Sequence, residues 1–300
     1  LPHAEGFPHD ILIPRTHRTG YAHALAASGA RLVDIGHNDR GTGAGVRGLE
    51  AWEIETALSS SVVAVAFSVN ATSIVDLPTA IAVCRANGVP LIVDAAAQLP
   101  PKQNLRRFIA MGADLVAFSG GKALGGPQAS GILAGRRDLV ASALLQQLDM
   151  DVAPETWTPP KMVDRTNLRG VPHHGIGRGF KAGKEEIVGL LTALGRFVRA
   201  DDAADNAALE VRLKAITAAL AGLDVRLVSA EQTGRVPVLE IAVPDALGLS
   251  ARLQRGDPPV HLSERHAARG VLTLDPQVLL PDHDAPLAAA LRTALQSTEV

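Results

Sequence analysis

The first half of the chain alternates short apolar runs with segments of helical periodicity. Each run is aliphatic or β-branched and is bounded by polar residues or glycine, which predicts a buried strand. The runs are Asp10–Pro14, Arg31–Ile35, Val62–Phe67, Leu91–Asp94, Asp114–Phe118 and Gly131–Ala134. Helical segments are predicted between them, near 18–28, 49–59, 77–87, 103–111 and 136–148. This alternation predicts an α/β fold with a mostly parallel sheet and helices on both faces.

The pattern changes in the second half. Residues 151–180 are rich in Pro, Gly and polar side chains and predict a long loop or inter-domain connection. Two helices should follow, because apolar stripes run from Ile187 to Leu194 and from Leu209 to Leu220. Strands are then expected near 225–230, 237–243 and 271–274, and a last helix carries Leu287, Leu291, Ala294 and Leu295. We predict a large domain over 1–165, a connecting loop and helix over 166–200, and a small α+β domain over 201–300.

Composition narrows the class of protein. Hydrophobic residues make up 47% of the chain, and the formal net charge is −2, so nucleic acid is not the expected partner. The single cysteine, Cys84, excludes an internal disulfide and fits a cytoplasmic protein. No apolar run is long enough to span a membrane, and no signal peptide is visible. The chain opens on Leu1 without an initiator Met, so we expect a segment to be missing in front.

Two polar positions follow predicted strands. Asp94 ends the apolar run Leu91–Val93, where a carboxylate faces the ligand side of a parallel sheet. Lys122 stands in Ser119-Gly120-Gly121-Lys122, after the next strand, in a stretch with six glycines between 120 and 135. Glycines allow the backbone to approach a ligand closely. The bland alternative for Asp94 is a helix cap or loop anchor.

The Gly-Lys pair also invites comparison with a nucleotide-binding phosphate loop. That alternative fails because Ala123, and not Ser or Thr, follows the lysine and no helix is predicted to start there. An amine and a carboxylate at one sheet edge are what pyridoxal 5'-phosphate (PLP) requires. The amine forms a Schiff base, and the carboxylate keeps the pyridine nitrogen protonated.

The stretch from Leu91 to Gly135 resembles the fold-type-I PLP-dependent enzymes. More narrowly, it resembles the group that contains L-seryl-tRNA(Sec) selenium transferase and D-glucosaminate-6-phosphate ammonia-lyase, and so does Gly175–Leu191, GIGRGFKAGKEEIVGLL. The resemblance implies a PLP-binding large domain, with Lys122 as the Schiff-base lysine and Asp94 as the partner of the pyridine nitrogen. It also implies a homodimer or larger even assembly.

Further cofactor contacts are implied by the same resemblance. His17 would stack on the PLP ring, although a structural hydrogen bond in a loop is an equal alternative. Ser119 would contact the phosphate, with a turn cap as its alternative. Gln98 would approach the phenolic oxygen, although it stands one position later than the Gln of many relatives. Gly121 occupies the position where many relatives carry His, and we expect it to line the cofactor.

The substrate side is less defined. Arg178, just before the linking helix, could bind a substrate carboxylate or phosphate with its bidentate guanidinium, or could simply be solvated. Arg265 and Arg269 are weaker candidates for the same role. Selenium transferases carry a second Arg where this chain has Lys181, which weakens a selenium-transfer interpretation. No metal site is expected, because the pair His173-His174 has no third ligand at a suitable spacing.

The resemblance also exposes an absence. Enzymes of this fold hold the PLP phosphate with a small-residue turn that leads into a helix, well before the stacking residue. Residues 1–10, LPHAEGFPHD, contain no such turn. We therefore expect about the first quarter of the usual chain to be absent.

Three functions remain open at this point. The leading one is a PLP-dependent elimination or ammonia-lyase reaction on an amino acid or amino-sugar acid. The second is a selenium transferase-like reaction on seryl-tRNA(Sec). The third is a non-catalytic homologue or inactive fragment that keeps the fold without a working cofactor site.

Overall fold

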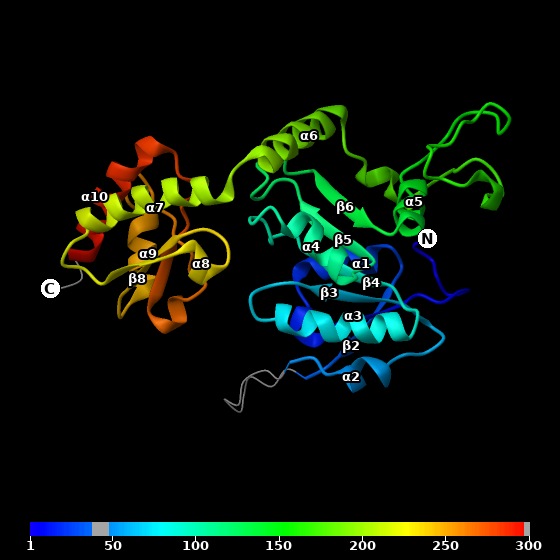
Figure 1. Cartoon of the computed structure of the whole chain (residues 1–300), viewed down its shortest axis with the longest axis horizontal. Helices are drawn as coiled ribbons and strands as arrows, with labels where there is room; N and C mark the ends of the chain where they lie inside the picture. The colour runs from blue at the N-terminus through cyan, green and yellow to red at the C-terminus, as the bar shows by residue number, and fades with distance from the viewer. Residues whose placement is uncertain (38–47, 297–300) are drawn as a thin grey trace. The chain divides into compact units, whose positions relative to one another are not determined.

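The computed structural model describes residues 1–37 and 48–296, and the chain divides into two compact units (Figure 1). Unit 1 comprises Leu1–Leu99 and Gln103–Phe197. Unit 2 comprises Pro100–Lys102 and Val198–Val300. Each unit has its own hydrophobic core, so each is described by itself.

Unit 1 is built on a six-stranded sheet with the order β2-β1-β3-β4-β5-β6. The strands are β1 Asp10–Pro14, β2 Arg31–Ile35, β3 Val62–Ser68, β4 Leu91–Asp94, β5 Leu115–Ser119 and β6 Gly131–Gly135. Every neighbouring pair from β2 to β5 is parallel, and β6 alone runs antiparallel, against β5. The predicted, mostly parallel sheet is confirmed.

Helices cover both faces of this sheet. They are α1 His23–Ala27, α2 Ala51–Glu55, α3 Leu77–Ala86, α4 Asn104–Met111, α5 Arg137–Leu145 and α6 Lys184–Arg199. Side chains alternate along a strand, so Leu12 packs in the core that holds α3 and α4, while Ile11 and Ile13 face the α1 side. The helix predicted over 18–28 is shorter than expected: a 3-10 turn at Gly20–Ala22 precedes α1.

The long segment after α5 is irregular, as its composition predicted. It contains short 3-10 helices at Arg165–Asn167 and Ile176–Phe180. Trp157 and Val163 are buried against Ala141 of α5, so this segment packs on α5 through a small apolar cluster of its own.

Unit 2 is a three-stranded antiparallel sheet, β7-β8-β9, covered by helices. Its elements are α7 Asp202–Ala219, β7 Val225–Val228, α8 Ala230–Thr233, β8 Val238–Ala242, α9 Ala246–Gln254, β9 Val271–Leu274 and α10 Asp284–Gln296. Asp201 begins α7 by accepting hydrogen bonds from the N–H groups of Ala203 and Ala204. The predicted small α+β architecture is present, and α9 is an element that the sequence pattern did not predict. No helix in the described part of the chain is long and apolar enough to cross a membrane.

Candidate active site

The carboxyl ends of five parallel strands meet at one edge of the unit 1 sheet. Along this edge Ser68 of β3 stands beside Asp94 of β4, and Asp94 stands beside Ala117 of β5. Two residues later β5 ends at Ser119, and Lys122 follows three residues beyond. The topology therefore brings the predicted lysine and the predicted carboxylate to the same edge, which is where parallel sheets bind ligands.

Lys122 lies in the loop of a hairpin. Residues 120–130 connect β5 to the antiparallel β6, and backbone hydrogen bonds close the loop on itself. The Gly120 N–H donates to the Ser130 carbonyl at 2.9 Å, Gly126 N–H to the Gly120 carbonyl at 2.8 Å, and Gly125 N–H to the Lys122 carbonyl at 2.8 Å. A strand, and not a helix, follows the lysine. This geometry confirms that the segment is not a nucleotide-binding phosphate loop.

The glycines beside the lysine are required by this close packing. A Cβ on Gly121 would lie 2.3 Å from Gln128 Oε1 and 2.7 Å from Gln128 Cα. A Cβ on Gly120 would lie 2.1 Å from Ser130 Oγ. The loop can fold back on itself only without side chains at these positions, and that fold holds the exposed Lys122 at the sheet edge.

The Asp94 carboxylate is half-buried and largely free to accept hydrogen bonds. Its Oδ1 accepts from the N–H of Ala96 at 3.0 Å. No other hydrogen bond to this carboxylate occurs within residues 1–37 and 48–296. Asp94 therefore anchors the turn after β4, as the bland alternative proposed, but it keeps one oxygen for a ligand.

His17 is buried and is held by the protein itself. The Ser68 N–H donates to His17 Nδ1 at 3.2 Å, and the His17 and Phe67 rings meet edge to face, with centroids 4.5 Å apart. Burial lowers the pKa of His17 to about 4, against an opposing effect of the Asp76 carboxylate, so the imidazole is neutral. The structural hydrogen bond of the alternative interpretation is present, while ring stacking stays a prediction.

Gln98 and Ser119 differ in what engages their side chains. The Gln98 amide donates to the Val69 carbonyl at 2.7 Å, and its Oε1 accepts no hydrogen bond from the described residues. The Ser119 hydroxyl has no hydrogen-bond partner among the described residues, so the turn-cap alternative has no contact to support it. Both cofactor contacts stay predictions.

Arg178 is held in a different cluster. Its Nε lies 3.8 Å from Asp149 Oδ2, just beyond α5, and His173 Nδ1 lies 3.8 Å from the other oxygen. The backbone N–H of His174 donates to Asp149 and lowers the pKa of that carboxyl group. Among the described residues no contact joins Arg178 to Lys122, and its substrate role stays a prediction. No group of three His, Cys, Asp or Glu side chains in the described ranges could hold a metal ion.

One residue at the lysine site was missed by the sequence analysis. The Lys122 Nζ lies 5.6 Å from the centroid of the Tyr21 ring. The available signal was that Tyr21 is the sole tyrosine of the chain and stands in the loop that follows the first strand.

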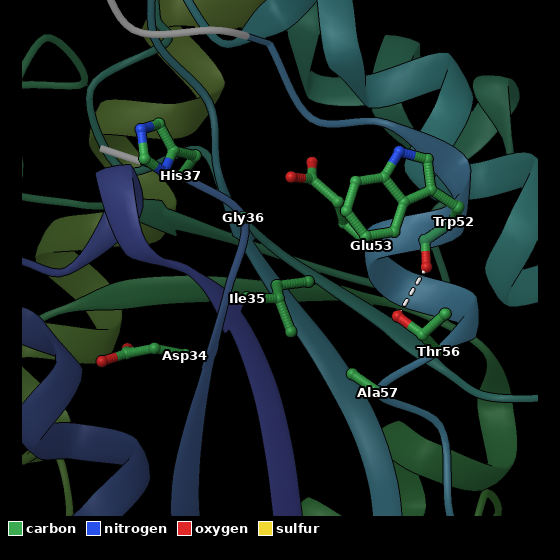
Figure 2. Close-up of a pocket in the computed structure, with 8 residues that line it drawn as sticks. All are labelled: Asp34, Ile35, Gly36, His37, Trp52, Glu53, Thr56 and Ala57. Carbon is green, nitrogen blue, oxygen red and sulfur yellow. Dashed lines mark hydrogen bonds between the residues drawn. The ribbon is translucent and has the colours of Figure 1, made fainter. Parts of the chain in front are cut away.

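A pocket lies apart from these residues. It has a volume of about 400 Å³ at the end of β2 and is lined by that strand and by α2 (Figure 2). Its lining consists of Asp34, Ile35, Gly36, His37, Trp52, Glu53, Thr56 and Ala57. Figure 2 shows the hydrogen bond that the Thr56 hydroxyl donates to the Trp52 carbonyl at the end of α2, and its length is 2.8 Å. None of the predicted site residues lines this pocket.

Comparison with known proteins shows similarity to one family model and to several enzymes. Residues 22–152 match the family model of L-seryl-tRNA selenium transferase. This match covers fewer than half of the residues of the chain. D-glucosaminate-6-phosphate ammonia lyase of Salmonella typhimurium is 26% identical over 97% of this chain and 72% of the relative. The 5'-C-glycyluridine monooxygenase-decarboxylase of a Streptomyces species is 29% identical over 98% of this chain and 69% of the relative.

The comparison with solved structures shows the fold. A solved structure of D-glucosaminate-6-phosphate ammonia-lyase matches 99% of this chain with a TM-score of 0.72 and 24% sequence identity, and the match covers 73% of that structure. This likeness establishes the type I fold of PLP-dependent enzymes. The selenium transferase family and the ammonia-lyase homologues depend on PLP, and they are lyases or transferases.

The residues of the chain fit that cofactor. The exposed Lys122 amine can bind an aldehyde, and the open oxygen of Asp94 can accept a hydrogen bond from a protonated pyridine nitrogen. Gly120 and Gly121 carry no side chains, so these two positions do not obstruct the sheet edge beside Lys122.

Proposed function

We propose that the chain is a PLP-dependent ammonia-lyase acting on an α-amino acid that carries a hydroxylated, sugar-like chain. The observation that carries the proposal is the placement of the Lys122 amine and the Asp94 carboxylate at one edge of a parallel sheet. Homology to an ammonia lyase over 97% of the chain supports the reaction class. The selection of substrate class follows from the two relatives, since one name describes an amino-sugar acid and the other a glycyl group joined to a nucleoside.

The residues divide the work in this proposal. Lys122 Nζ would hold the cofactor through its aldehyde and would serve as the base that removes the proton at the substrate α-carbon. Asp94 accepts the hydrogen bond of the pyridine nitrogen and keeps it protonated. When bound, PLP accepts the electron pair that the α-carbon releases. Ser119, Gln98, Gly121 and His17 are the proposed further contacts of the cofactor.

The bond changes balance without an oxidant. Lys122 takes the α-proton, and the hydroxyl group at the β-carbon leaves as water. Hydrolysis at the former α-carbon then consumes one water and releases ammonia. The product is a keto acid with the same number of carbons that has lost the hydroxyl group of its β-carbon. We propose Arg178 as the group that binds the substrate carboxylate or phosphate, with the bidentate geometry of its guanidinium as the reason.

The experiment is a panel of amino-sugar acids and hydroxy amino acids, with and without phosphate, incubated with the chain and PLP. Ammonia and keto acid should appear in equal amounts, without oxygen consumption. Lys122→Ala should lower the rate by about 10² to 10⁴, the usual contribution of a proton-transfer group. Asp94→Asn should also lower the rate, because the pyridine nitrogen would lose its charged partner. Arg106→Ala, on the outer part of α4, is the matched control and should leave the rate unchanged.

Other outcomes would redirect the proposal. Oxygen consumption with release of carbon dioxide would replace the lyase by a reaction like that of the Streptomyces relative. Borohydride reduction without a pyridoxyl label on Lys122, together with no product, would favour the non-catalytic homologue. A homodimer or larger even assembly is part of the proposal, and light scattering of the purified chain tests it.

Selenium transfer to seryl-tRNA is the second candidate, and the family match of residues 22–152 favours it. A gel shift with seryl-tRNA at low salt should then show a complex that weakens steeply as salt rises. The lyase proposal expects no shift.

A further inference from the structure

An aromatic ring lies near the Lys122 amine. Its Nζ lies 5.6 Å from the centroid of the Tyr21 ring, within the range of a cation–π interaction. No carboxylate pairs with Lys122 within residues 1–37 and 48–296. A carboxylate partner would bind the nitrogen directly through a charge-assisted hydrogen bond. An aromatic face holds the nitrogen in place more weakly and forms no hydrogen bond with it, so the amine stays available to an aldehyde.

Tyr21 and Lys122 belong to two loops that leave different strands of the unit 1 sheet. The Tyr21 loop leaves β1, and the lysine loop leaves β5, with β3 and β4 between them in the sheet. Adjacent strands are about 4.8 Å apart, so the two loops must approach each other across the strand ends that carry Ser68 and Asp94. The Tyr21–Lys122 contact therefore spans the place where the cofactor is proposed to lie.

The position of Tyr21 is set by its neighbours in sequence. His17 is fixed to the Ser68 N–H, and Arg18 Nε bonds Asp34 Oδ1 at 2.7 Å. Thr19 Oγ1 then accepts from the N–H of Tyr21 at 3.2 Å. Three consecutive residues before Tyr21 are thus fixed by hydrogen bonds, and they hold the backbone that carries the ring. Even so, the Tyr21 side chain remains 75% exposed, which a ring with a purely structural role in the core would not be.

We propose that Tyr21 is the aromatic positioning residue of the lysine site: its ring holds the Lys122 amine at the sheet edge and packs against the cofactor and the substrate amine. This inference rests on the proposed function and adds to it a residue from a second loop. It predicts that the ring face is needed and the phenol hydroxyl is not, because the contact is between the ring and the nitrogen.

The first test needs no cofactor. Lys122 and Lys214, a surface lysine of α7, are labelled with trinitrobenzenesulfonate in the same sample and quantified by peptide mass spectrometry. Tyr21→Leu should raise the ratio of Lys122 to Lys214 labelling about two- to fivefold, the size of an exposed cation–π contact. Tyr21→Phe should keep the wild-type ratio. An unchanged ratio in Tyr21→Leu would overturn the contact. Circular dichroism should match for all three chains, since Tyr21 is exposed.

The second test uses the single tyrosine as a reporter. PLP is fixed on the wild-type chain with borohydride, and nitration of Tyr21 by tetranitromethane is then followed by mass spectrometry. Fixation at Lys122 should slow nitration several-fold, whereas PLP added to Lys122→Ala should not. A wild-type chain that carries the label on Lys122 but nitrates at its original rate would overturn the inference alone. Absence of a label on Lys122 would overturn the proposed function, and the labelling ratio would still decide the Tyr21–Lys122 contact.

Discussion

Two loops meet at the sheet edge that carries Asp94 and Lys122, and they are held in opposite ways. The lysine loop, residues 120–130, is closed by its own backbone and by glycines that leave no room for a Cβ. The first-strand loop, residues 15–22, is tied down by side chains that reach distant parts of the chain: His17 to Ser68 and Arg18 to Asp34. The lysine loop is therefore stabilised by contacts within its own sequence, and the first-strand loop by contacts with residues distant in sequence.

This difference predicts different responses to change. The lysine loop should be sensitive to added atoms and insensitive to pH or salt. The first-strand loop should tolerate added atoms but respond to protonation and ionic strength. Both tryptophans, Trp52 and Trp157, belong to unit 1, so their fluorescence reports the unfolding of the unit that carries both loops.

The largest effect is expected from acid on the first-strand loop. His17 has a pKa of about 4 in the folded chain and 6.5 as its ordinary value. As the pH falls from 6.5 to 4, the unfolded chain binds a proton that the folded chain does not, so the free energy of unfolding decreases. The loss reaches roughly 3 kcal/mol near pH 4. Urea unfolding followed by tryptophan fluorescence should show it.

A matched variant isolates this effect. His17→Asn offers an oxygen to the Ser68 N–H but does not titrate, so the decrease in its free energy of unfolding between pH 6.5 and 4 should be smaller by the same amount. An identical decrease in wild type and His17→Asn would mean that the imidazole is not buried and neutral.

The second effect concerns added atoms in the two loops. Gly121→Ala places a Cβ against Gln128 and should cost about 1–3 kcal/mol of unfolding free energy. Gly20→Ala, in the first-strand loop, meets no atom within 4 Å and should change stability by less than about 0.5 kcal/mol. Equal unfolding midpoints for the two variants would contradict the contrast between the loops. Gly121→Ala should also slow the trapping of PLP on Lys122.

The smallest effect is expected from the ion pair of the first-strand loop. Arg18 and Asp34 are partly exposed, at 39% and 33%, so their coupling in a double-mutant cycle of Arg18→Ala and Asp34→Ala should be about 0.2–1 kcal/mol. Added salt should weaken it by screening. A coupling of zero at low salt would show that another contact fixes the loop.

The contrast between the loops also explains what the sequence could predict. The strand β4 was predicted with its observed bounds and β5 within one residue, because buried parallel strands are continuous apolar runs. Given parallel strands, Asp94 and Lys122 must share an edge. The tight lysine loop was visible as a cluster of glycines, since each glycine answers a local steric need.

What the sequence did not predict depends on contacts between distant residues. The neighbourhood of Tyr21 and Lys122 requires the path of the first-strand loop over two intervening strands, and no local pattern records that path. The helix α9 was missed although Asp245 caps it by accepting from the Gly248 N–H. Its buried Leu249 and Leu253 are too few to give a clear periodic stripe.

The antiparallel strand β6 has a consequence for protein engineering. Five cross-strand pairs, from Leu115–Gly135 to Ser119–Gly131, fix where the loop begins and ends. Inserting or deleting one residue in β6 would turn its side chains to the opposite face and displace the loop by about 3.4 Å, one strand step. Catalytic geometry tolerates about 1 Å. The position of the Lys122 amine therefore depends on the number of residues between the paired positions of β5 and β6. Transplanting the loop into another protein with a different number of residues should abolish activity even when every site residue is retained.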